Sequence, residues 1–492
     1  MIDVSTILRG FKAELSAKFF YYLTTGIVIV FLTRQLAPDE YGRLFLVISV
    51  LSIGRLFSSV GLAKSTATYV SNYLDTDPSQ IPHIVRKSFQ YNLITISIVV
   101  TALFVSAGTI AHLLDDPTLE PLLLVGILYI VCATLYNYSR VVLQGFENIA
   151  QSSTVYASEG VGRLLFVVAL VAVGYGTLGA LVGYIMGFAL SAGIGLTLLF
   201  LRTSRYPSAD VMESGLPRDI ISYSVPLTVT RGAWVLEQDI DIVIVGFFLN
   251  PATVGFYTIG KQVVRFCTGP ASSIGFAVGP QYSESTVADD ESGAARVYET
   301  MLVSGLLFYL PAIAGLIILT DPIVTTLFGP DYRGAVPILQ VFAVGIGLLA
   351  VTEMTEDILD YLGKATARAK MKAATSIGNI VFTVLFLQLL GAVGAAFATV
   401  LMQFFYTGLC LYLVESEIAL RQRYLLGKLG HIGAITAVMA GIVAGLSRYI
   451  TGAVSLSVII ACGAVLWAAL TIGSGLIDVR TVLDTFSNSG ND

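Results

Sequence analysis

Residues Asp219–Gly279 read DIISYSVPLTVTRGAWVLEQDIDIVIVGFFLNPATVGFYTIGKQVVRFCTGPASSIGFAVG. The stretch predicts two long apolar helices joined at Asn250-Pro251, because Asn and Pro together mark a break between helices. Ionisable side chains interrupt both runs: Arg231, Glu237, Asp239 and Asp241 in the first, Lys261 and Arg265 in the second. An ionisable group in a spanning helix costs about 3 kcal/mol on insertion scales, so it usually faces a bundle interior or a wet cavity. We therefore expect this hairpin to form one wall of a substrate cavity.

The composition of the whole chain is that of a membrane protein. Its 492 residues are 55% hydrophobic and only 12% charged, about half the charged fraction of a soluble protein, and the mean hydropathy is +0.80. Runs of about 20 apolar residues fit helices that cross about 30 Å of hydrocarbon. The ten-residue alternation of barrel strands is absent. The predicted fold class is therefore an all-α integral membrane protein with essentially no room for a soluble domain.

Motifs for soluble chemistry are missing from the sequence. No G-x-x-x-x-G-K-[ST] phosphate loop is present, and the three histidines are far apart in sequence. The four cysteines lie inside apolar runs, without C-x-x-C or metal-ligand spacing, and are read as small buried hydrophobes: Cys132, Cys267, Cys410 and Cys462. The sequence predicts a transporter rather than an enzyme, with no catalytic residues, no metal, no cofactor and no nucleic-acid partner.

Apolar runs and their Pro, Gly or polar breaks predict fourteen spans. An amphipathic segment over residues 1–18 precedes them and is expected to lie along the membrane interface, without a cleavable signal peptide. The spans are 17–36, 42–62, 86–108, 120–143, 153–174, 177–200, 219–248, 253–279, 298–319, 334–356, 371–390, 392–414, 430–449 and 454–475.

The distribution of Lys and Arg predicts the orientation. With the N-terminus inside, 20 of the 28 basic residues fall in inner segments, four in outer loops and four within spans. Arg140 and Arg163 are counted with an inner loop. Basic residues accumulate on the cytoplasmic side, so we expect a protein of the cytoplasmic membrane with both termini in the cytoplasm. Three longer inner breaks, 65–82, 203–217 and 282–295, are read as polar connectors.

Two similar turns indicate an internal repeat. Pro38 and Gly42 follow the first span, and Pro251 and Gly255 follow the seventh, each at an offset of 213 residues. Six spans per half make a parallel repeat, whose two lobes can rock about a central cavity. The predicted division is an N-terminal lobe at 1–202, a linker at 203–217, a C-terminal lobe at 218–415, a connector at 416–429, and the last two spans with the tail at 430–492.

The buried bases suggest an anion-binding cavity. Its candidate members are Arg55, Arg231, Lys261, Arg265 and Lys18, the last because the offset of 213 places it opposite Arg231. Arg matches phosphate oxygens bidentately and Lys acts as a point charge, so the set suits a phosphate or pyrophosphate. Glu237, Asp239 and Asp241 would orient the bases, bind sugar hydroxyls or take a coupling cation. Asp239 points away from the face shared by the other two acids. The alternative is that all these groups form internal salt bridges that fix helix packing.

A second polar cluster lies at the inner end of span ten. Its acids are Glu353, Glu356, Asp357 and Asp360, followed by Lys364, Arg368, Lys370 and Lys372. Asp360 and Lys364 are one helical turn apart and can pair. The cluster is either a solvated helix end with salt bridges or a cytoplasmic gate.

The order of several short motifs resembles the polysaccharide-biosynthesis, O-antigen-type flippase family of the multidrug/oligosaccharidyl-lipid/polysaccharide flippase superfamily. They are Leu36-Ala-Pro-Asp-Glu-Tyr-Gly42, Tyr223-Ser-Val-Pro226, Asp241-Ile-Val-Ile-Val-Gly246, Val254-Gly-Phe-Tyr257 and Tyr361-Leu-Gly-Lys364. The resemblance covers nearly the whole chain. One departure is Ile242 after Asp241, where the family often has a basic or polar residue, so a local ion pair is not carried over.

The resemblance implies two six-helix lobes and two extra helices that flank a groove for a lipid tail. It implies movement of a polyprenyl- or dolichyl-phosphate-linked oligosaccharide from the inner to the outer leaflet by alternating access, with the phosphate on cavity bases. The expected partners are this substrate and membrane lipids, with glycosyltransferases or a polymerase of the same pathway as further candidates; a monomer is expected.

The rival hypotheses are a cation-coupled drug or metabolite antiporter, which would want an acid-dominated cavity, and a membrane polymerase or scaffold, which would want a large outer loop.

Overall fold

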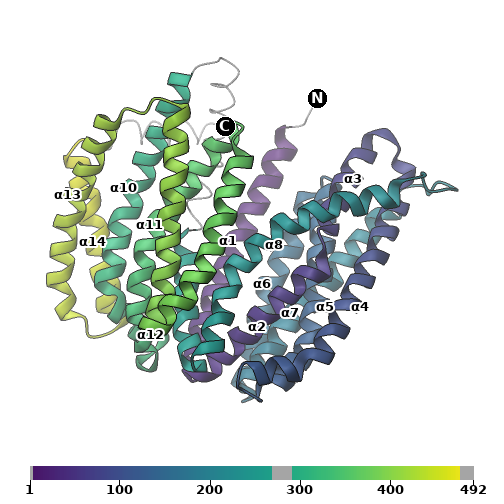
Figure 1. The fold of residues 1–492 in the computed structure, drawn as a ribbon, viewed down its shortest axis with the longest axis horizontal. Helices are drawn as coiled ribbons and strands as arrows, with labels where there is room; N and C mark the ends of the chain where they lie inside the picture. Colours follow the sequence, from purple (N-terminus) through teal and green to yellow (C-terminus); the bar gives the residue numbers. More distant parts are fainter. Residues whose placement is uncertain (1–3, 269–290, 477–492) are drawn as a thin grey trace. The chain divides into compact units, whose positions relative to one another are not determined.

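The computed structural model describes residues 4–268 and 291–476 and divides the chain into two compact units, Met1–Thr258 and Ile259–Asp492. The described residues are almost entirely helical and include no strand (Figure 1). The predicted all-α fold class is therefore confirmed. The finer division into lobes, linker and connector stays a prediction.

The first unit is a bundle of long helices. Its α-helices are α1 (Val4–Gln35), α2 (Pro38–Ser59), α3 (Leu62–Thr76), α4 (Ile81–Leu113), α5 (Leu119–Gly145), α6 (Ile149–Ala172), α7 (Gly176–Thr203) and α8 (Leu216–Phe248). A short 3-10 turn, Pro78–Gln80, precedes α4, and another helix starts at Pro251 and continues into the second unit. The helix α6 packs against α1 and α7, and α8 lies along α2 and α3.

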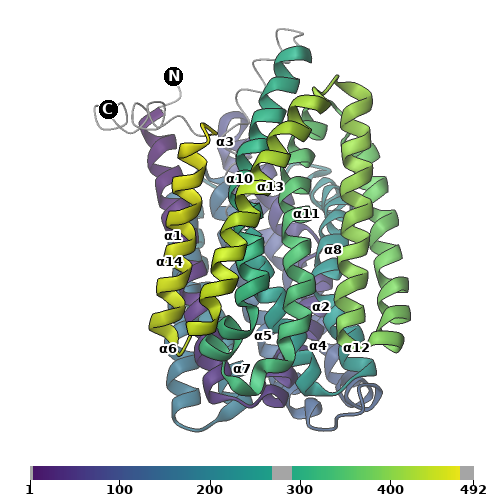
Figure 2. The same ribbon diagram turned by 90° about the vertical axis from the view of Figure 1, so that its left-hand side faces the viewer.

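The described part of the second unit contains the continuation of the helix that starts at Pro251 and five further α-helices. They are α10 (Glu291–Ile323), α11 (Val336–Tyr361), α12 (Ala365–Glu417), α13 (Gln422–Leu446) and α14 (Ala453–Gly473). A π-turn at Val324–Phe328 and a 3-10 turn at Pro330–Ala335 join α10 to α11. The helices α13 and α14 lie beside α10 (Figure 2). The core includes the fully buried side chains of Tyr298 and Tyr406.

The predicted spans correspond to helices of the structure. Within the described ranges, eleven helices are long and apolar enough to cross a membrane, judged by length and composition. The charge-bearing helix α8 and the helix that starts at Pro251 account for two more of the predicted spans. Helix α12 accounts for a pair, because Gly391 breaks it with φ 62° and ψ −147°. This is the break that the sequence places between the spans 371–390 and 392–414, so a count of about fourteen agrees with the structure.

The segment after α2 was wrongly predicted as a polar connector. Most of residues 65–82 form α3 and a 3-10 turn. The reason is that α3 has an apolar stripe, with Leu62, Ala63 and Val70 buried. Ser65 also donates a hydrogen bond of 2.9 Å to the backbone carbonyl of Ile220 in α8, so a polar residue supports packing here instead of marking a loop.

The two turns of the proposed repeat touch each other inside the first unit. Both Pro38 and Pro251 occupy the first position of a helix, where Pro is well tolerated because its missing N–H would be unpaired anyway. Gly42 lies against the carbonyl oxygen of Pro251, and Gly255 lies against that of Pro38. This reciprocal contact is what two sequence-related turns packed about a local two-fold axis would make.

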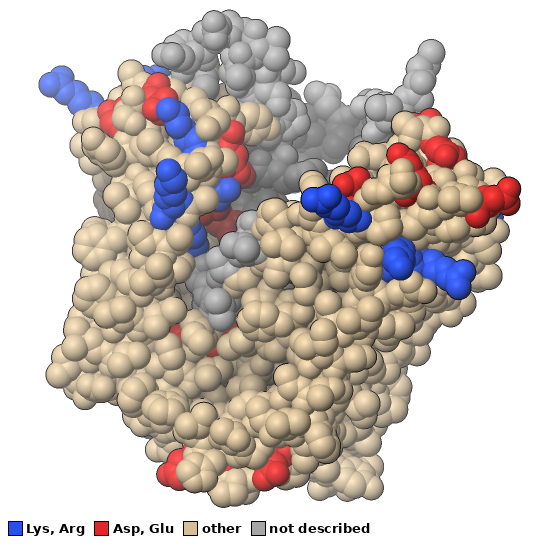
Figure 3. All heavy atoms as spheres, turned by 45° about the vertical axis from the view of Figure 1, so that its right-hand side comes forward, with Lys and Arg blue, Asp and Glu red and all other residues tan. Residues whose placement is uncertain are grey.

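Charged side chains gather at the ends of the helices (Figure 3). On the face shown, the charged side chains form separate patches, and the broad surface between these patches is almost free of charge. An uncharged band between polar ends is the surface expected of helices that cross a bilayer.

Candidate functional site

Arg55 lies in a small polar pocket of the first unit. The pocket measures about 20 Å³, room for about one water molecule. It is lined by side chains of α2, α5 and α8: Ser52, Leu56, Ser59, Thr134, Asn137 and Val235. The pocket therefore places hydroxyl and amide groups, together with two apolar side chains, beside half-buried Arg55 within a spanning helix. The setting suits recognition of an anionic group, with hydrogen-bonding neighbours for the oxygens around it.

Hydrogen bonds hold the helix around Arg55 against its neighbours. The hydroxyl groups of Ser58 and Thr134 are 2.6 Å apart. The Asn92 amide and the Thr95 hydroxyl of α4 donate to the backbone carbonyl of Ser58 at 3.2 Å and 2.6 Å. The side chain of Asn92 is buried. These contacts fix the turn of α2 that carries Arg55, and so pre-organise the pocket.

The other predicted bases differ in burial. Lys18 is exposed on α1. In the second unit Lys261 is half-buried and Arg265 is exposed on the same helix. The side chains of Arg231 and Glu237 lie outside the described part of the structure. That these bases share one cavity with Arg55 stays a prediction.

Asp241 is held by a hydrogen-bonded network at the end of α8. Its side chain is buried, it accepts a hydrogen bond of 2.8 Å from the Tyr257 hydroxyl, and it accepts another of 2.9 Å from the Ile242 backbone N–H. Asp239 is half-buried. The contact with Tyr257 ties α8 to the helix that starts at Pro251, which shows a packing role; roles in cation or sugar binding stay predictions.

The most deeply buried ion pair among the described residues of the first unit was not predicted from the sequence. Glu159 and Arg163 lie one turn apart in α6, with Oε1 and Nη1 3.5 Å apart and relative exposures of 1% and 4%. The guanidinium donates to the Thr25 hydroxyl at 2.6 Å. It also lies over the Tyr21 ring at 4.8 Å and the Tyr184 ring at 5.4 Å. Helices α1, α6 and α7 thus meet around one guanidinium.

An aromatic stack connects this pair to a second one. The rings of Tyr21 and Tyr156 are stacked with centroids 4.6 Å apart. Arg140 lies 4.3 Å over the Tyr156 ring and forms an ion pair of 3.4 Å with Glu14. Glu14 also accepts a hydrogen bond of 2.9 Å from Ser153. Two stacked tyrosine rings therefore lie between two guanidinium groups in the polar core of the first unit, and each cation is attracted to a ring face.

Arg163 was counted with an inner loop on the basis of its charge alone, and this assignment was wrong. It lies in the middle of α6, and Gly187 of α7 packs directly against its backbone. The spacing Glu159-x-x-x-Arg163, with Gly160 and Gly162 between, was the available signal: an acid and a base one turn apart beside small residues that admit close helices.

The acidic cluster of α11 is partly neutralised by α12. Arg368 donates to Glu356 at 2.7 Å and to both carboxylate oxygens of Asp360 at 3.0 Å each. The Tyr406 hydroxyl donates to the other oxygen of Glu356 at 2.7 Å. The expected pairing of Asp360 with Lys364 is wrong, since Lys364 forms an ion pair of 2.7 Å with Glu417.

The other two acids of this cluster differ in exposure. Glu353 is exposed, and Asp357 is half-buried beside Glu356 and Asp360 along α11. The arrangement fits a salt-bridged helix end, and the gate interpretation stays a prediction.

An apolar cavity of about 610 Å³ lies inside the second unit, among α10, α11, α13 and α14. Its wall is almost entirely apolar, with Phe308 and Trp467 5.2 Å apart at one side. Leu316 and Leu319 of α10, Met439 of α13 and Ile459 of α14 continue the lining. The cavity has the chemistry of a site for a hydrocarbon chain. Among the described residues, no group of three or more His, Cys, Asp or Glu could hold a metal ion.

A bundle of many spanning helices with polar groups among them has the fold of a membrane transporter. Comparisons with solved structures support this fold class. The lipid II flippase MurJ, in an inward closed conformation, aligns with a TM-score of 0.76 over 94% of this chain and 98% of that one, at 14% identity. An inward-facing multidrug resistance MATE family transporter of the MOP superfamily aligns with a TM-score of 0.66 over 81% and 94%, also at 14% identity.

Sequence similarity places the chain within that class. Residues 31–337 match the polysaccharide biosynthesis protein family, and the chain belongs to this family. A probable low-salt glycan biosynthesis flippase, Agl15 of Haloferax volcanii, is 22% identical over 52% of this chain and 54% of its own length. The teichuronic acid biosynthesis protein TuaB of Bacillus subtilis is 23% identical over 35% of each chain. The chain thus spans about half or less of these two relatives. The predicted family resemblance is confirmed.

Proposed function

We propose that this protein is a flippase that moves a lipid-linked oligosaccharide, carried on polyprenyl or dolichyl phosphate, across the cytoplasmic membrane for assembly of a cell-surface glycan. The observation that carries the proposal is the similarity to the fold of a lipid II flippase over 94% of the chain. Membership of the polysaccharide biosynthesis family supports the glycan as cargo.

Two features of the chain fit the two chemical parts of such a substrate. Arg55, with hydroxyl and amide groups beside it, suits a single phosphate oxygen, because its pocket has room for about one water-sized group. The apolar cavity beside Phe308 and Trp467 suits a stretch of the lipid carrier. Rocking of two lobes would expose the site to one leaflet and then to the other. Arg231, Lys261, Arg265 and Lys18 would complete the basic surface.

The remaining elements of the proposal concern setting and partners. Both termini would lie in the cytoplasm, and the protein would act as a monomer. Glycosyltransferases or a polymerase of the same pathway would supply the substrate or receive the product. Glu353, Glu356, Asp357 and Asp360 would form the cytoplasmic gate, whose salt bridges to Arg368 open when the lobes move. Glu237, Asp239 and Asp241 would orient the bases or take a coupling cation.

A second candidate is a cation-coupled antiporter of drugs or metabolites, favoured by the similarity to a MATE family transporter. Such a carrier would want an acid-dominated cavity. The basic pocket around Arg55 favours an anionic cargo instead.

The test is translocation by the full chain in vesicles that contain a fluorescent lipid-linked oligosaccharide, with a membrane-impermeant quencher outside. Arg55→Ala, Arg231→Ala and Arg265→Ala should each abolish translocation and leave membrane insertion intact. Arg205→Ala removes an exposed base of the linker and should transport normally. Normal transport by all three cavity variants contradicts the basic-cavity mechanism. Drug efflux without any glycan transport supports the antiporter.

A further inference from the structure

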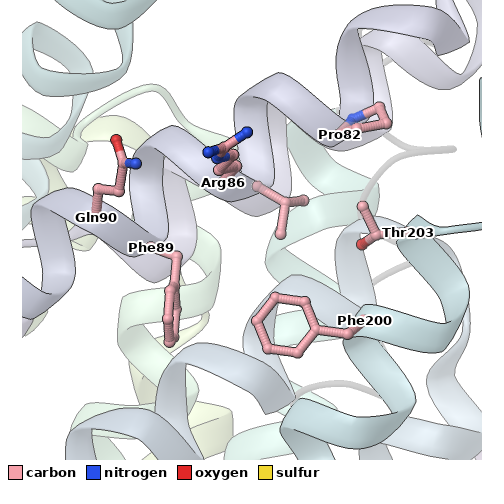
Figure 4. Close-up of a pocket in the computed structure, with 7 residues that line it drawn as sticks. Pro82, Arg86, Phe89, Gln90, Phe200 and Thr203 are labelled. Atoms are coloured by element: carbon pink, nitrogen blue, oxygen red, sulfur yellow. The ribbon is translucent and has the colours of Figure 1, made fainter. Parts of the chain in front are cut away.

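A cavity of about 380 Å³ opens between α4 and α7, at the end of the helices that the charge distribution assigns to the cytoplasm. Figure 4 shows Arg86 and Gln90 on α4, with Phe200 and Thr203 of α7 across from them. Pro82 and Val85 complete the lining with Phe89. The cavity lies within the first unit and is separate from the pocket of Arg55.

The floor of this cavity is rigid and apolar. The rings of Phe89 and Phe200 meet edge to face with centroids 5.6 Å apart. The preceding residue on α4, Ser88, has its hydroxyl 2.6 Å from the Tyr138 hydroxyl, which also donates to the Val85 carbonyl at 3.1 Å. Val85 and Ser88 are both buried. The floor is therefore fixed by the core of the bundle.

The rim of the cavity carries donors that the protein does not use. Arg86 and Gln90 are exposed, one turn apart on α4, and make no ion pair or side-chain hydrogen bond to any described residue. The Thr203 hydroxyl is committed to the Leu199 carbonyl at 2.8 Å. A free guanidinium and a free amide on one edge can bind a phosphate group, the guanidinium through two parallel hydrogen bonds.

The cavity continues into a lipid-facing surface. Deeper along α4, Leu93, Ile94 and Ile98 are 42%, 55% and 63% exposed. On α7, Phe200 and Leu201 are 46% and 58% exposed. Only 17% of the apolar window of α4 is buried in the protein. Donors at a helix end, followed by an apolar track one to two turns deeper, match the headgroup and acyl chain of a membrane lipid.

We propose that this cavity, with Arg86 and Gln90 at its rim, binds the phosphate headgroup of an anionic membrane phospholipid whose acyl chain lies along α4. The adjacent base on the same helix, Lys87, lies 5.4 Å over the Tyr91 ring. A free phosphate ion would use the rim alone, whereas a phospholipid also covers exposed Phe200 and Ile94. The apolar continuation therefore favours the lipid.

The full-length protein in neutral detergent, examined by native mass spectrometry with added phosphatidylglycerol or phosphatidylcholine, tests this proposal. The wild type should retain phosphatidylglycerol at least about fivefold more strongly than phosphatidylcholine. This ratio corresponds to about 1 kcal/mol, the attraction of one basic side chain to an anionic surface. Arg86→Gln should remove most of this preference, and Arg86→Lys should keep part of it. Arg205→Gln, an exposed base outside the cavity, is the matched control and should bind as the wild type does.

Three results would overturn the proposal. The first is an Arg86→Gln variant with the wild-type preference, and the second is equal retention of the two lipids by the wild type. The third is displacement of the lipid by millimolar inorganic phosphate, which would identify a site for soluble anions. None of these readouts depends on translocation. The lipid-binding proposal is therefore tested independently of the proposed flippase function.

Discussion

Gly42 in the first turn of α2 lies directly against the carbonyl oxygen of Pro251, and Gly255 lies in the same relation to Pro38. A Cβ atom built on Gly255 would be 2.5 Å from the Pro38 oxygen, and one built on Gly42 would overlap the Pro251 carbonyl. Both neighbours are backbone atoms, which cannot turn away as a flexible side chain can. The close approach of the two helix starts therefore requires glycine at both positions.

We predict that Gly42→Ala lowers the stability of the protein. The added methyl group would force α2 away from the turn at Pro251, and overpacking of this kind costs about 1–3 kcal/mol. Gly193→Ala in α7 is the control, because nothing lies within 4 Å of a Cβ at that position. Thermal unfolding of the purified proteins in detergent measures the difference. Equal unfolding temperatures for Gly42→Ala and Gly193→Ala would show that the contact is looser than described.

The ion pair of Glu159 and Arg163 leads to a prediction about charge balance in the core. Arg163→Gln should be strongly destabilising, by about 3–5 kcal/mol, because it leaves a buried carboxylate without its counter-charge. Glu159→Gln combined with Arg163→Gln should recover much of the loss, since both charges are then gone. A double-mutant cycle on unfolding temperatures measures the coupling.

The control for this cycle is the ion pair of Arg333 and Asp321, whose side chains are 71% and 42% exposed. Arg333→Gln should change the unfolding temperature little, because solvent screens an exposed pair. If the destabilisation of the double variant equalled the sum of the destabilisations of Glu159→Gln and Arg163→Gln, the two charges would not depend on each other and the pair would have no structural role.

The hydrogen bond from Tyr257 to Asp241 leads to a third prediction. Tyr257→Phe keeps the ring but removes the donor, so the buried carboxylate loses the hydrogen bond of 2.8 Å from the Tyr257 hydroxyl. We expect a loss of about 1–3 kcal/mol in stability, the cost of leaving a buried polar group unsatisfied. Tyr175→Phe, at an exposed ring in the same unit, is the control. Unchanged stability of Tyr257→Phe would show that water replaces the hydroxyl group readily.

The positions of the spans were predictable because length and hydropathy determine them. A helix must present about 20 apolar residues to the hydrocarbon, so each apolar run fixes one crossing. Gly391 was predictable as a break because only glycine adopts its φ of 62° without strain. The segment that became α3 was misread because a polar stretch can still carry a buried apolar stripe.

The candidate site was less predictable because its contacts join distant parts of the chain. Arg55 stood out by its position inside an apolar run, but the hydroxyl groups around it come from α2 and α5, and Val235 comes from α8. Arg163 was misassigned because a charge count does not show whether the base has a buried partner. The partner that satisfies Asp241, Tyr257, lies 16 residues further along the chain, and the sequence alone does not specify that contact.

The loop between α4 and α5 provides a prediction about pH. Asp116 accepts hydrogen bonds from the Thr118 hydroxyl and backbone N–H at 2.6 Å and 3.0 Å, and from Arg43 at 2.7 Å. Burial alone would raise the pKa of Asp116, but these donors hold the pKa below its ordinary value. The folded state therefore releases this proton more readily than the unfolded state, whose pKa is about 3.9. The contribution to stability is present above that pH and is lost as the pH falls through the lower pKa of the folded protein.

Asp116→Asn should therefore lower the unfolding temperature at pH 6 to 7 and lose this effect as the medium becomes more acidic than about pH 4. Asp115→Asn is the matched control, since this neighbouring carboxylate is exposed and makes no ion pair with any described residue. Unfolding temperatures recorded against pH for the three proteins measure the prediction. A difference between wild type and Asp116→Asn that stayed constant down to pH 3 would mean that the hydrogen-bonding shape of the side chain, rather than its charge, stabilises the loop.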